Sequence, residues 1–232
     1  LSILSLGAAD IPRGCDSNSD EIAYILGFCD AKVAILENKT QLLKVVEKRS
    51  SLPKLTDIII LDENYTDIHN DEFNIHLFKD LISGGQKIIK KDKEYIDREI
   101  EKGTIDDLAT IIFTSGTTGK PKGVMITHSN FIYQISTIPE IINTTHKDKW
   151  LCVLPVWHSF ERVMQYVGLS SGSSLCYSKP IGPIFLADFL AINPTRMASV
   201  PRIWAALRDG IYIKKFIVHQ LFGKICFTFL SL

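Results

Sequence analysis

The residues best suited to chemistry lie in the segment 113–123, which reads Phe-Thr-Ser-Gly-Thr-Thr-Gly-Lys-Pro-Lys-Gly. Its eleven positions hold three glycines, four hydroxyl side chains and two lysines. Glycine lets the backbone approach a ligand closely, and hydroxyl and backbone N–H groups donate hydrogen bonds to anionic oxygens. Lysine supplies a compact positive charge for phosphate. The segment is therefore predicted to be a phosphate-binding loop.

The flanks of this segment favour a binding loop, although most stretches rich in glycine and hydroxyls are solvated turns. The apolar run Leu108 to Phe113 predicts a strand that enters the loop, and Lys122 to Thr127 predicts a strand that leaves it. Ser129 then offers an N-cap for a helix. The phosphate motif G-x-x-x-x-G-K-[ST] does not fit, because Lys120 is followed by Pro121. The dinucleotide pattern G-x-G-x-x-G does not occur here either.

The run Thr114 to Gly123 resembles the signature loop of the adenylate-forming, or AMP-binding, superfamily at every position. That family holds acyl-CoA synthetases, luciferases and the adenylation domains of nonribosomal peptide synthesis. The resemblance implies that a carboxylate reacts with ATP to give an acyl adenylate and pyrophosphate, after which the acyl group passes to a thiol. It also implies ATP and Mg²⁺ as cofactors and CoA as co-substrate.

The same resemblance assigns roles within the loop. The loop would hold the β- and γ-phosphates of ATP, and Thr117 would also contact the magnesium ion. Oriented donors and a cation would stabilise the charge that grows on pyrophosphate as its bond to the α-phosphorus breaks. The residues expected to bind the nucleotide are Thr114, Ser115, Gly116, Thr117, Thr118, Gly119 and Lys122.

A second segment, Leu154 to Arg162, resembles the family motif in which an aromatic residue or a histidine lines the acyl pocket. His158 would have this role and is the predicted catalytic residue, whereas an isolated histidine would more often make a structural hydrogen bond. The runs Trp157 to Arg162 and Ile11 to Ser17 look most like the long-chain fatty acyl branch, with Cys15 in place of the expected Ser or Thr. A long-chain fatty acid–CoA ligase is therefore predicted, and a ligase for a shorter acyl or aryl acid is the alternative.

Composition bounds the partners and the compartment. The 232 residues carry 26 basic and 26 acidic side chains, so no excess of positive charge favours nucleic acid. The expected partners are fatty acid, ATP and CoA. Five cysteines without a C-x-x-C pair are typical of a reducing compartment, which predicts a cytoplasmic protein. The apolar tail 216–232 is too short and polar to predict a membrane-spanning helix, but it leaves contact with a membrane surface open.

Strand and helix signals alternate along the chain, which predicts an α/β fold with parallel-rich sheets flanked by helices. By resemblance, this fold would be part of the large N-terminal domain of an adenylate-forming enzyme. Strands are expected at 33–36, 58–61, 108–113, 122–127, 150–154, 174–177 and 197–200. Helices are expected after a capping box at 17–20, at 41–48, around 77–82, from 130 to a break near 139, at 159–167, at 185–192 and after Pro201.

Several motifs of the family do not occur in this sequence. They include the Tyr-Gly-x-Thr-Glu segment whose glutamate binds magnesium, the aspartate that holds the ribose hydroxyls, the hinge and the C-terminal lysine. Residues 1–232 are therefore expected to be a partial AMP-binding N-terminal domain without its C-terminal domain, with little or no ligase activity alone. The second possibility is a non-catalytic remnant that binds nucleotide without turnover.

Overall fold

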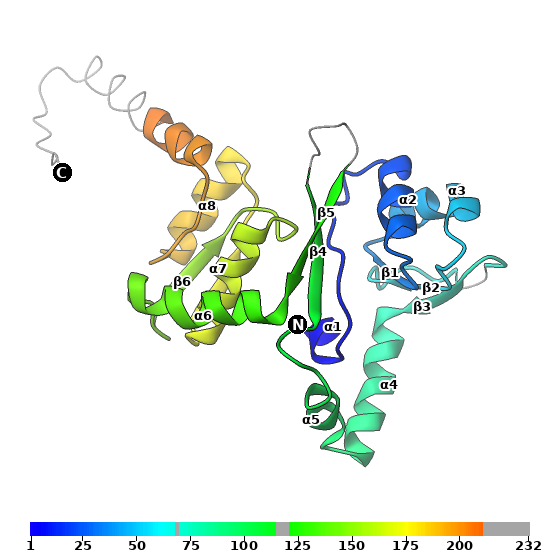
Figure 1. Cartoon of the computed structure of the whole chain (residues 1–232). Coiled ribbons are helices and arrows are strands. Elements are labelled where there is room, and N and C mark those ends of the chain that lie inside the picture. Colours follow the sequence, from blue (N-terminus) through cyan, green and yellow to red (C-terminus); the bar gives the residue numbers. More distant parts are fainter. Residues whose placement is uncertain (68–69, 115–120, 211–232) are drawn as a thin grey trace, which may run out of the picture. The chain divides into compact units, whose positions relative to one another are not determined.

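The computed structural model describes residues 1–67, 70–114 and 121–210 (Figure 1). The chain divides into two compact units, Leu1–Ile132 and Tyr133–Leu232. Within the described residues, two sheets are parallel and a third is an antiparallel pair. Helices flank the parallel strands, so the predicted α/β fold with parallel-rich sheets is confirmed.

The first unit contains a parallel sheet with the strand order β1 (Val33–Leu36), β2 (Asp57–Ile60) and β3 (Asn74–Leu77). Runs of valine and isoleucine favour the first two strands. The continuous apolar run at 58–61 predicts a strand buried on both faces, but the structure fully buries only one face of β2. Ile59 is half-buried, because the described helices cover the opposite face, and Leu61 lies outside the strand and is 42% exposed.

Helices α2 (Ser19–Phe28) and α3 (Lys39–Glu47) lie against this sheet (Figure 1). Each helix begins after an asparagine N-cap. Asn18 Oδ1 accepts a hydrogen bond from the Glu21 N–H at 2.8 Å, and Asn38 Oδ1 accepts one from the Gln41 N–H at 3.3 Å. Their apolar faces and one face of the sheet form the core of the unit. Its buried members are Ala34, Leu42, Val45, Leu52, Leu55, Ile58, Ile60, Tyr65 and Phe73.

The region 62–107 is more ordered than its sequence predicts. It contains β3, the helix α4 (Phe78–Lys91) and the helix α5 (Tyr95–Ile100). The helix expected around 77–82 continues through Gly84 and Gly85, because glycine lowers helix propensity without blocking the backbone hydrogen bonds. Two short helical turns in the same unit are α1 (Ser2–Ser5) and η1 (Arg49–Ser51).

The strands expected on either side of the predicted loop are β4 (Leu108–Thr114) and β5 (Lys122–Thr127), and the structure pairs them as an antiparallel hairpin. The helix α6 (His128–Ile142) follows directly. It begins before Ser129, so the predicted N-cap lies in its first turn instead. The expected break near Pro139 does not occur, and the helix continues for three more residues. Proline removes only one backbone donor from the helix at this point.

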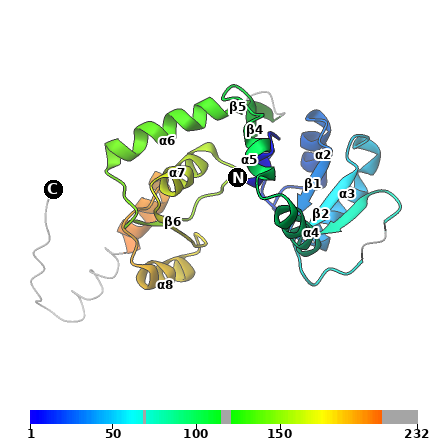
Figure 2. The ribbon, with the colours of Figure 1, turned by 90° about the horizontal axis from the view of Figure 1, so that it is seen from below.

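The second unit contains the parallel pair β6 (Lys149–Cys152) and β7 (Ser174–Tyr177), which are linked by α7 (Ser159–Ser170) and followed by α8 (Gly182–Ile192). Figure 2 shows α7 and α8 on opposite sides of β6. Alternate residues of β6 therefore enter two separate cores. One contains Trp150, Cys152 and Val167, and the other contains Leu151, Val153 and Phe185.

The strand expected at 197–200 is not formed. Only an isolated bridge joins Arg196 to Trp150, with the Leu151 N–H donating to the Arg196 carbonyl at 2.9 Å. Hydrogen bonds to the Asp148 side chain hold this segment in place of the backbone hydrogen bonds of a strand. Residues 201–210 are helical, as predicted from Pro201 in the first turn.

Asp148 joins the start of β6 to the segment that follows α8. Its carboxylate accepts hydrogen bonds from Thr195 Oγ1 and the Thr145 N–H, both at 2.7 Å, and from Arg196 Nε at 3.3 Å. The Thr195 hydroxyl, the Thr145 N–H and the charge of Arg196 lower the pKa of Asp148 to about 2. The carboxylate is therefore bound as an anion in the fold.

We expect the stability of the second unit to fall in acid through Asp148. The pKa in the fold lies below its usual value of 3.8, so the stabilisation is complete above that value and is lost as the pH falls towards about 2. Asp148→Asn should be less stable at neutral pH and should lose less on acidification. Tryptophan fluorescence can follow this unfolding, because the three tryptophans lie in the second unit. Asp209→Asn, at an exposed site, is the control.

Candidate functional site

The ends of the predicted phosphate loop are held together by the β4–β5 hairpin. Thr114 and Lys122 are register partners, and Thr114 Oγ1 donates to the Lys122 carbonyl at 3.5 Å. Both side chains are exposed. The structure thus brings together these two predicted site residues. The other loop residues lie outside the described residues: Ser115, Gly116, Thr117, Thr118 and Gly119.

An aromatic cluster supports the base of this hairpin. Tyr24 and Phe28 of α2 lie 6.3 and 6.0 Å from the Phe113 ring, both close to edge-on. The Tyr24 hydroxyl also donates to the carbonyl of Pro121 at 3.2 Å. Because edge-to-face rings prefer a defined geometry, these contacts fix where the loop leaves and re-enters the sheet.

Gly123 lies where a side chain would not fit. A Cβ atom at this position would be 2.9 Å from Ile111 Cγ2 and 3.3 Å from Phe113 Cζ. Its partner across the strands is Phe113, whose ring covers the glycine. The last glycine of the signature therefore makes room for the aromatic cluster.

Gly123→Ala is expected to lower the free energy of unfolding of the first unit by about 1–3 kcal/mol, because the added methyl overpacks a rigid pair of neighbours. Thermal unfolding followed by far-ultraviolet circular dichroism would measure this loss. Gly84→Ala is the matched control, since its Cβ would meet nothing within 4 Å. That helix substitution should be neutral or stabilise by about 0.5–1 kcal/mol. Equal effects of the two substitutions would contradict the steric role of Gly123.

The opening segment Ile11 to Ser17 is anchored to the helices α2 and α3 of the first unit. Arg13 pairs with Glu21 of α2 and donates from Nε to Ser17 Oγ at 3.1 Å. Lys44 of α3 donates to the Cys15 and Ser17 carbonyls at 2.9 and 2.7 Å. Cys15, the departure from the expected residue, is exposed, and its carbonyl rather than its thiol makes the anchor.

His158 lies in the second unit, directly before α7, and is the N-cap residue of that helix. Its N–H donates to the Pro155 carbonyl at 3.0 Å, and its carbonyl accepts from the Arg162 N–H at 3.2 Å. The imidazole is exposed and its centroid is 6.5 Å from the Trp157 ring. The backbone of His158 is thus fixed by hydrogen bonds while its ring is exposed.

Glu161 is a buried acid that the sequence did not identify as important. It is 2% exposed and accepts from Gln165 Nε2 at 3.0 Å. It also accepts from the Leu154 N–H and the Cys152 thiol. Burial raises the pKa of Glu161, against these hydrogen bonds. Burial and the neighbouring Glu161 raise the pKa of Cys152 to about 12, so this thiol is not a nucleophile.

Glu161 ties three parts of the second unit together. Cys152 ends β6, Leu154 follows it in the segment that leads to His158, and Gln165 lies one turn further along α7. Tyr177 on β7 donates to Gln165 Oε1 at 3.3 Å and extends the network. The available signal in the sequence was an acid placed four residues before a glutamine, in a helix whose only other charged residue is Arg162.

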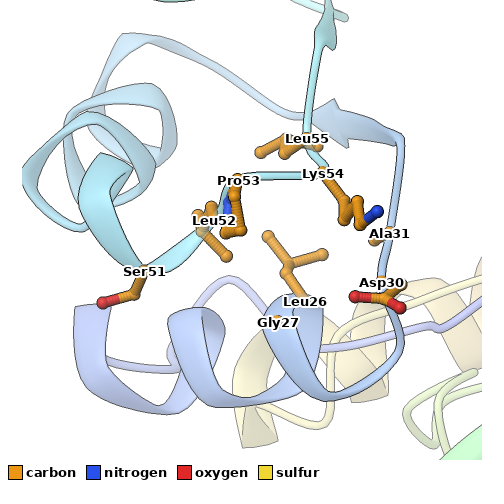
Figure 3. A pocket seen from close by; sticks show the side chains of 9 residues that line it. All are labelled: Leu26, Gly27, Asp30, Ala31, Ser51, Leu52, Pro53, Lys54 and Leu55. Atoms are coloured by element: carbon orange, nitrogen blue, oxygen red, sulfur yellow. The ribbon is translucent and has the colours of Figure 1, made fainter.

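A small hollow lies apart from all these residues, within the first unit (Figure 3). Figure 3 shows Leu26 reaching into it from α2. Its volume of about 200 Å³ is below the usual range of ligand pockets. Its lining residues are Leu26, Gly27, Asp30, Ala31, Ser51, Leu52, Pro53, Lys54 and Leu55.

The described residues contain neither a candidate metal site nor a candidate membrane span. Residues 1–67, 70–114 and 121–210 contain no group of three or more His, Cys, Asp or Glu placed to hold a metal ion. Thr117, the predicted magnesium contact, is outside these ranges. Over the same ranges, no helix has the length and apolar character needed to cross a bilayer. The apolar tail 216–232 lies outside the described residues.

The chain is similar to ligases of known sequence. A long-chain fatty acid–[acyl-carrier-protein] ligase of Arabidopsis thaliana, named as chloroplastic, is 28% identical over 218 residues, which cover 90% of this chain and 29% of that protein. Long-chain fatty acid–CoA ligase 5 of Rattus norvegicus is 29% identical over an alignment of 241 residues. The match covers 94% of this chain and 33% of that protein. The chain thus spans about a third of the length of these relatives.

Solved structures share the fold. The N-terminal domain of FACL13 from Mycobacterium tuberculosis matches with a TM-score of 0.65 and 19% identity, over 89% of this chain and 47% of that chain. The anthranilate CoA ligase AuaEII in complex with anthranoyl-AMP matches with a TM-score of 0.68 and 19% identity, over 88% and 37%. The predicted fold, part of the N-terminal domain of an adenylate-forming enzyme, is therefore confirmed.

The match to a protein family covers nearly the whole sequence. Residues 1–223 match the family described as AMP-binding enzyme. The β4–β5 hairpin and the two parallel sheets all lie within the matched residues. On this match and on the shared fold, the chain belongs to the AMP-binding enzyme family of adenylate-forming ligases.

Proposed function

We propose that this chain is the nucleotide-binding part of an AMP-forming ligase that activates a long-chain fatty acid and transfers it to CoA. The observation that supports this most directly is the β4–β5 hairpin, which holds Thr114 opposite Lys122 at the two ends of the signature loop. The long-chain assignment is supported by the anchored segment Ile11 to Ser17 and by relatives that are named as long-chain ligases.

In this proposal, the loop residues bind ATP. The Lys122 ammonium and the hydroxyls of Thr114, Ser115, Thr117 and Thr118 suit the phosphate oxygens, because these groups donate hydrogen bonds that anionic oxygens accept. Thr117 would also hold Mg²⁺ through its hydroxyl oxygen, since this ion prefers oxygen ligands. Bound there, Mg²⁺ would supply positive charge beside the β- and γ-phosphates, and the donors of the loop would orient these phosphates.

The function can be tested on the full-length gene product that contains residues 1–232. It should release pyrophosphate from ATP with palmitate and release less with acetate or benzoate. Faster release with either short acid would assign the alternative substrate class. No release with any acid, together with ATP binding, would assign the non-catalytic alternative.

We also propose that residues 1–232 are a partial N-terminal domain that has little or no ligase activity alone. The short share of the relatives that the chain spans supports this. The motifs expected to bind ribose and to contact the carboxylate do not occur in it. Palmitate-dependent pyrophosphate release by the purified 232-residue chain would show this proposal to be wrong.

His158→Ala in the full-length ligase is expected to raise the KM for the acid by a factor that varies with acyl chain length, because the exposed ring would help to position the carboxylate and its chain. The KM for ATP should change little. Initial rates with a series of fatty acids would measure both constants. His146→Ala, at another exposed histidine of the second unit, is the control. An effect confined to ATP would contradict the acyl-pocket role.

A further inference from the structure

The helix α4 (Phe78–Lys91) carries a row of exposed apolar side chains. None of its residues is buried. Its large apolar residues recur three, four or seven positions apart, which is helical spacing, so they share one face of the helix. These residues and their exposed fractions are Phe78 44%, Leu81 40%, Ile82 46%, Ile88 51% and Ile89 37%.

The charged residues of α4 are mainly basic. Four lysines and one aspartate give the helix a net charge of +3, and the four lysines are Lys79, Lys87, Lys90 and Lys91. Among the residues that the structure describes, none of these lysines forms an ion pair with a carboxylate. Lys79 donates to the Glu63 carbonyl at 3.1 Å. The helix therefore combines an uncovered apolar face with an uncompensated positive face.

A second helix shows that exposed apolar residues alone do not make this pattern. Exposed apolar residues also occur at α8: Ile181 directly before its first turn is exposed, and Leu190 near its end is 80% exposed. This helix, however, contains no lysine or arginine. Its single charged residue is Asp188. The combination of apolar and basic faces is thus a property of α4 and not of exposed helices of this chain in general.

We propose that α4 binds the surface of an anionic lipid bilayer. Its apolar face would enter the boundary between headgroups and acyl chains, and its lysines would pair with anionic headgroups. The 14 residues form a rod about 21 Å long, which suits a flat surface. The charge complementarity favours anionic lipid over an apolar protein groove, which would leave the lysines without partners.

This proposal rests on the proposed function only for its purpose, since long-chain fatty acids partition into membranes and a ligase for them gains from lying on one. Vesicle binding needs neither ATP nor catalysis. A chain that binds vesicles without activating fatty acids, or the reverse, would therefore separate the failure of one proposal from the failure of the other.

The test is co-sedimentation of the whole 232-residue chain with vesicles of phosphatidylcholine, with and without phosphatidylserine. Binding should need phosphatidylserine and should weaken as salt is raised. Lys87→Ala with Lys90→Ala should weaken binding by about 25-fold, at roughly fivefold for each lysine. Ile82→Ser with Ile89→Ser should weaken it by about tenfold or more. Leu190→Ser, which removes an exposed leucine from α8, should leave it unchanged.

Hydrogen exchange with and without vesicles would locate the contact. Backbone amides of α4 should gain protection, and circular dichroism of the variants should match the parent, because every substituted side chain in α4 is exposed. Three outcomes would overturn the proposal: equal binding to neutral vesicles, binding unaffected by the α4 variants, and protection confined to residues outside α4. Self-association through α4 without vesicle binding would overturn it as well.

Discussion

Thr117→Ala and Lys122→Ala are each expected to slow pyrophosphate release by the full-length ligase by about 10- to 150-fold. This range corresponds to the roughly 1.5–3 kcal/mol that a hydrogen bond to a charged group contributes. Lys122 is exposed at the first position of β5, and its carbonyl is bonded to Thr114. Its side chain can therefore meet a phosphate without breaking a contact of the fold. Single-turnover release of pyrophosphate would measure the loss in both variants.

The controls for this prediction separate charge from stability. Lys122→Arg keeps the positive charge and should retain more activity than Lys122→Ala. Lys147→Ala, at an exposed lysine of the second unit, should retain full activity. Melting temperatures should be unchanged in all three variants, because neither lysine is buried. If Thr117→Ala and Lys122→Ala both release pyrophosphate at the parental rate, the loop has no part in the mechanism.

Local sequence signals were sufficient for the elements that surround the loop. The strands at 33–36, 122–127 and 174–177 were predicted with the bounds that the structure has. Valine, isoleucine and aromatic residues set these strands against polar or glycine-containing flanks, so the preference is visible without tertiary contacts. The pairing of Thr114 with Lys122 was not among these predictions and comes from the register of the hairpin.

Other elements depend on contacts that the sequence does not display. The strand β3 is short and mixed in polarity, yet it pairs with β2, and His76 Nε2 lies 2.8 Å from Asp57 Oδ1 across that pair. The run 197–200 has the composition of a strand, but the backbone hydrogen bonds to β6 come from Thr195 and Arg196, which precede it. In both cases, the available partner strand decided the outcome and local propensity did not.

Glu161 shows the corresponding limit for the candidate site. An acid in a helix is usually solvated, so burial of this residue could not be predicted from its type. Its partners are fixed only when β6 packs against α7, which brings Cys152 and the Leu154 N–H to its carboxyl group. Leu154 begins the segment that leads to His158. Glu161, which was not identified from the sequence, therefore supports the predicted residue His158 through the backbone.

Glu161→Ala is expected to lower the free energy of unfolding of the second unit by about 3 kcal/mol or more. The substitution would leave the Leu154 N–H and the Gln165 amide buried without their acceptor, and each unsatisfied group costs about 1–3 kcal/mol. Denaturant unfolding followed by tryptophan fluorescence would measure the loss. Glu140→Ala, at an exposed glutamate of α6, should change stability by less than about 0.5 kcal/mol.

Glu161→Gln separates the hydrogen bonds from the charge. Glutamine can accept from the Leu154 N–H and from Gln165, so this variant should lose much less stability than Glu161→Ala. Burial raises the pKa of Glu161 above its usual value of 4.5, so the folded state holds its proton more tightly than the unfolded state. The contribution of Glu161 is therefore complete below about pH 4.5 and declines as the pH rises through the raised pKa. The stability of Glu161→Gln relative to the parent should improve over that rise, and a constant difference would show that Glu161 is not strained by its burial.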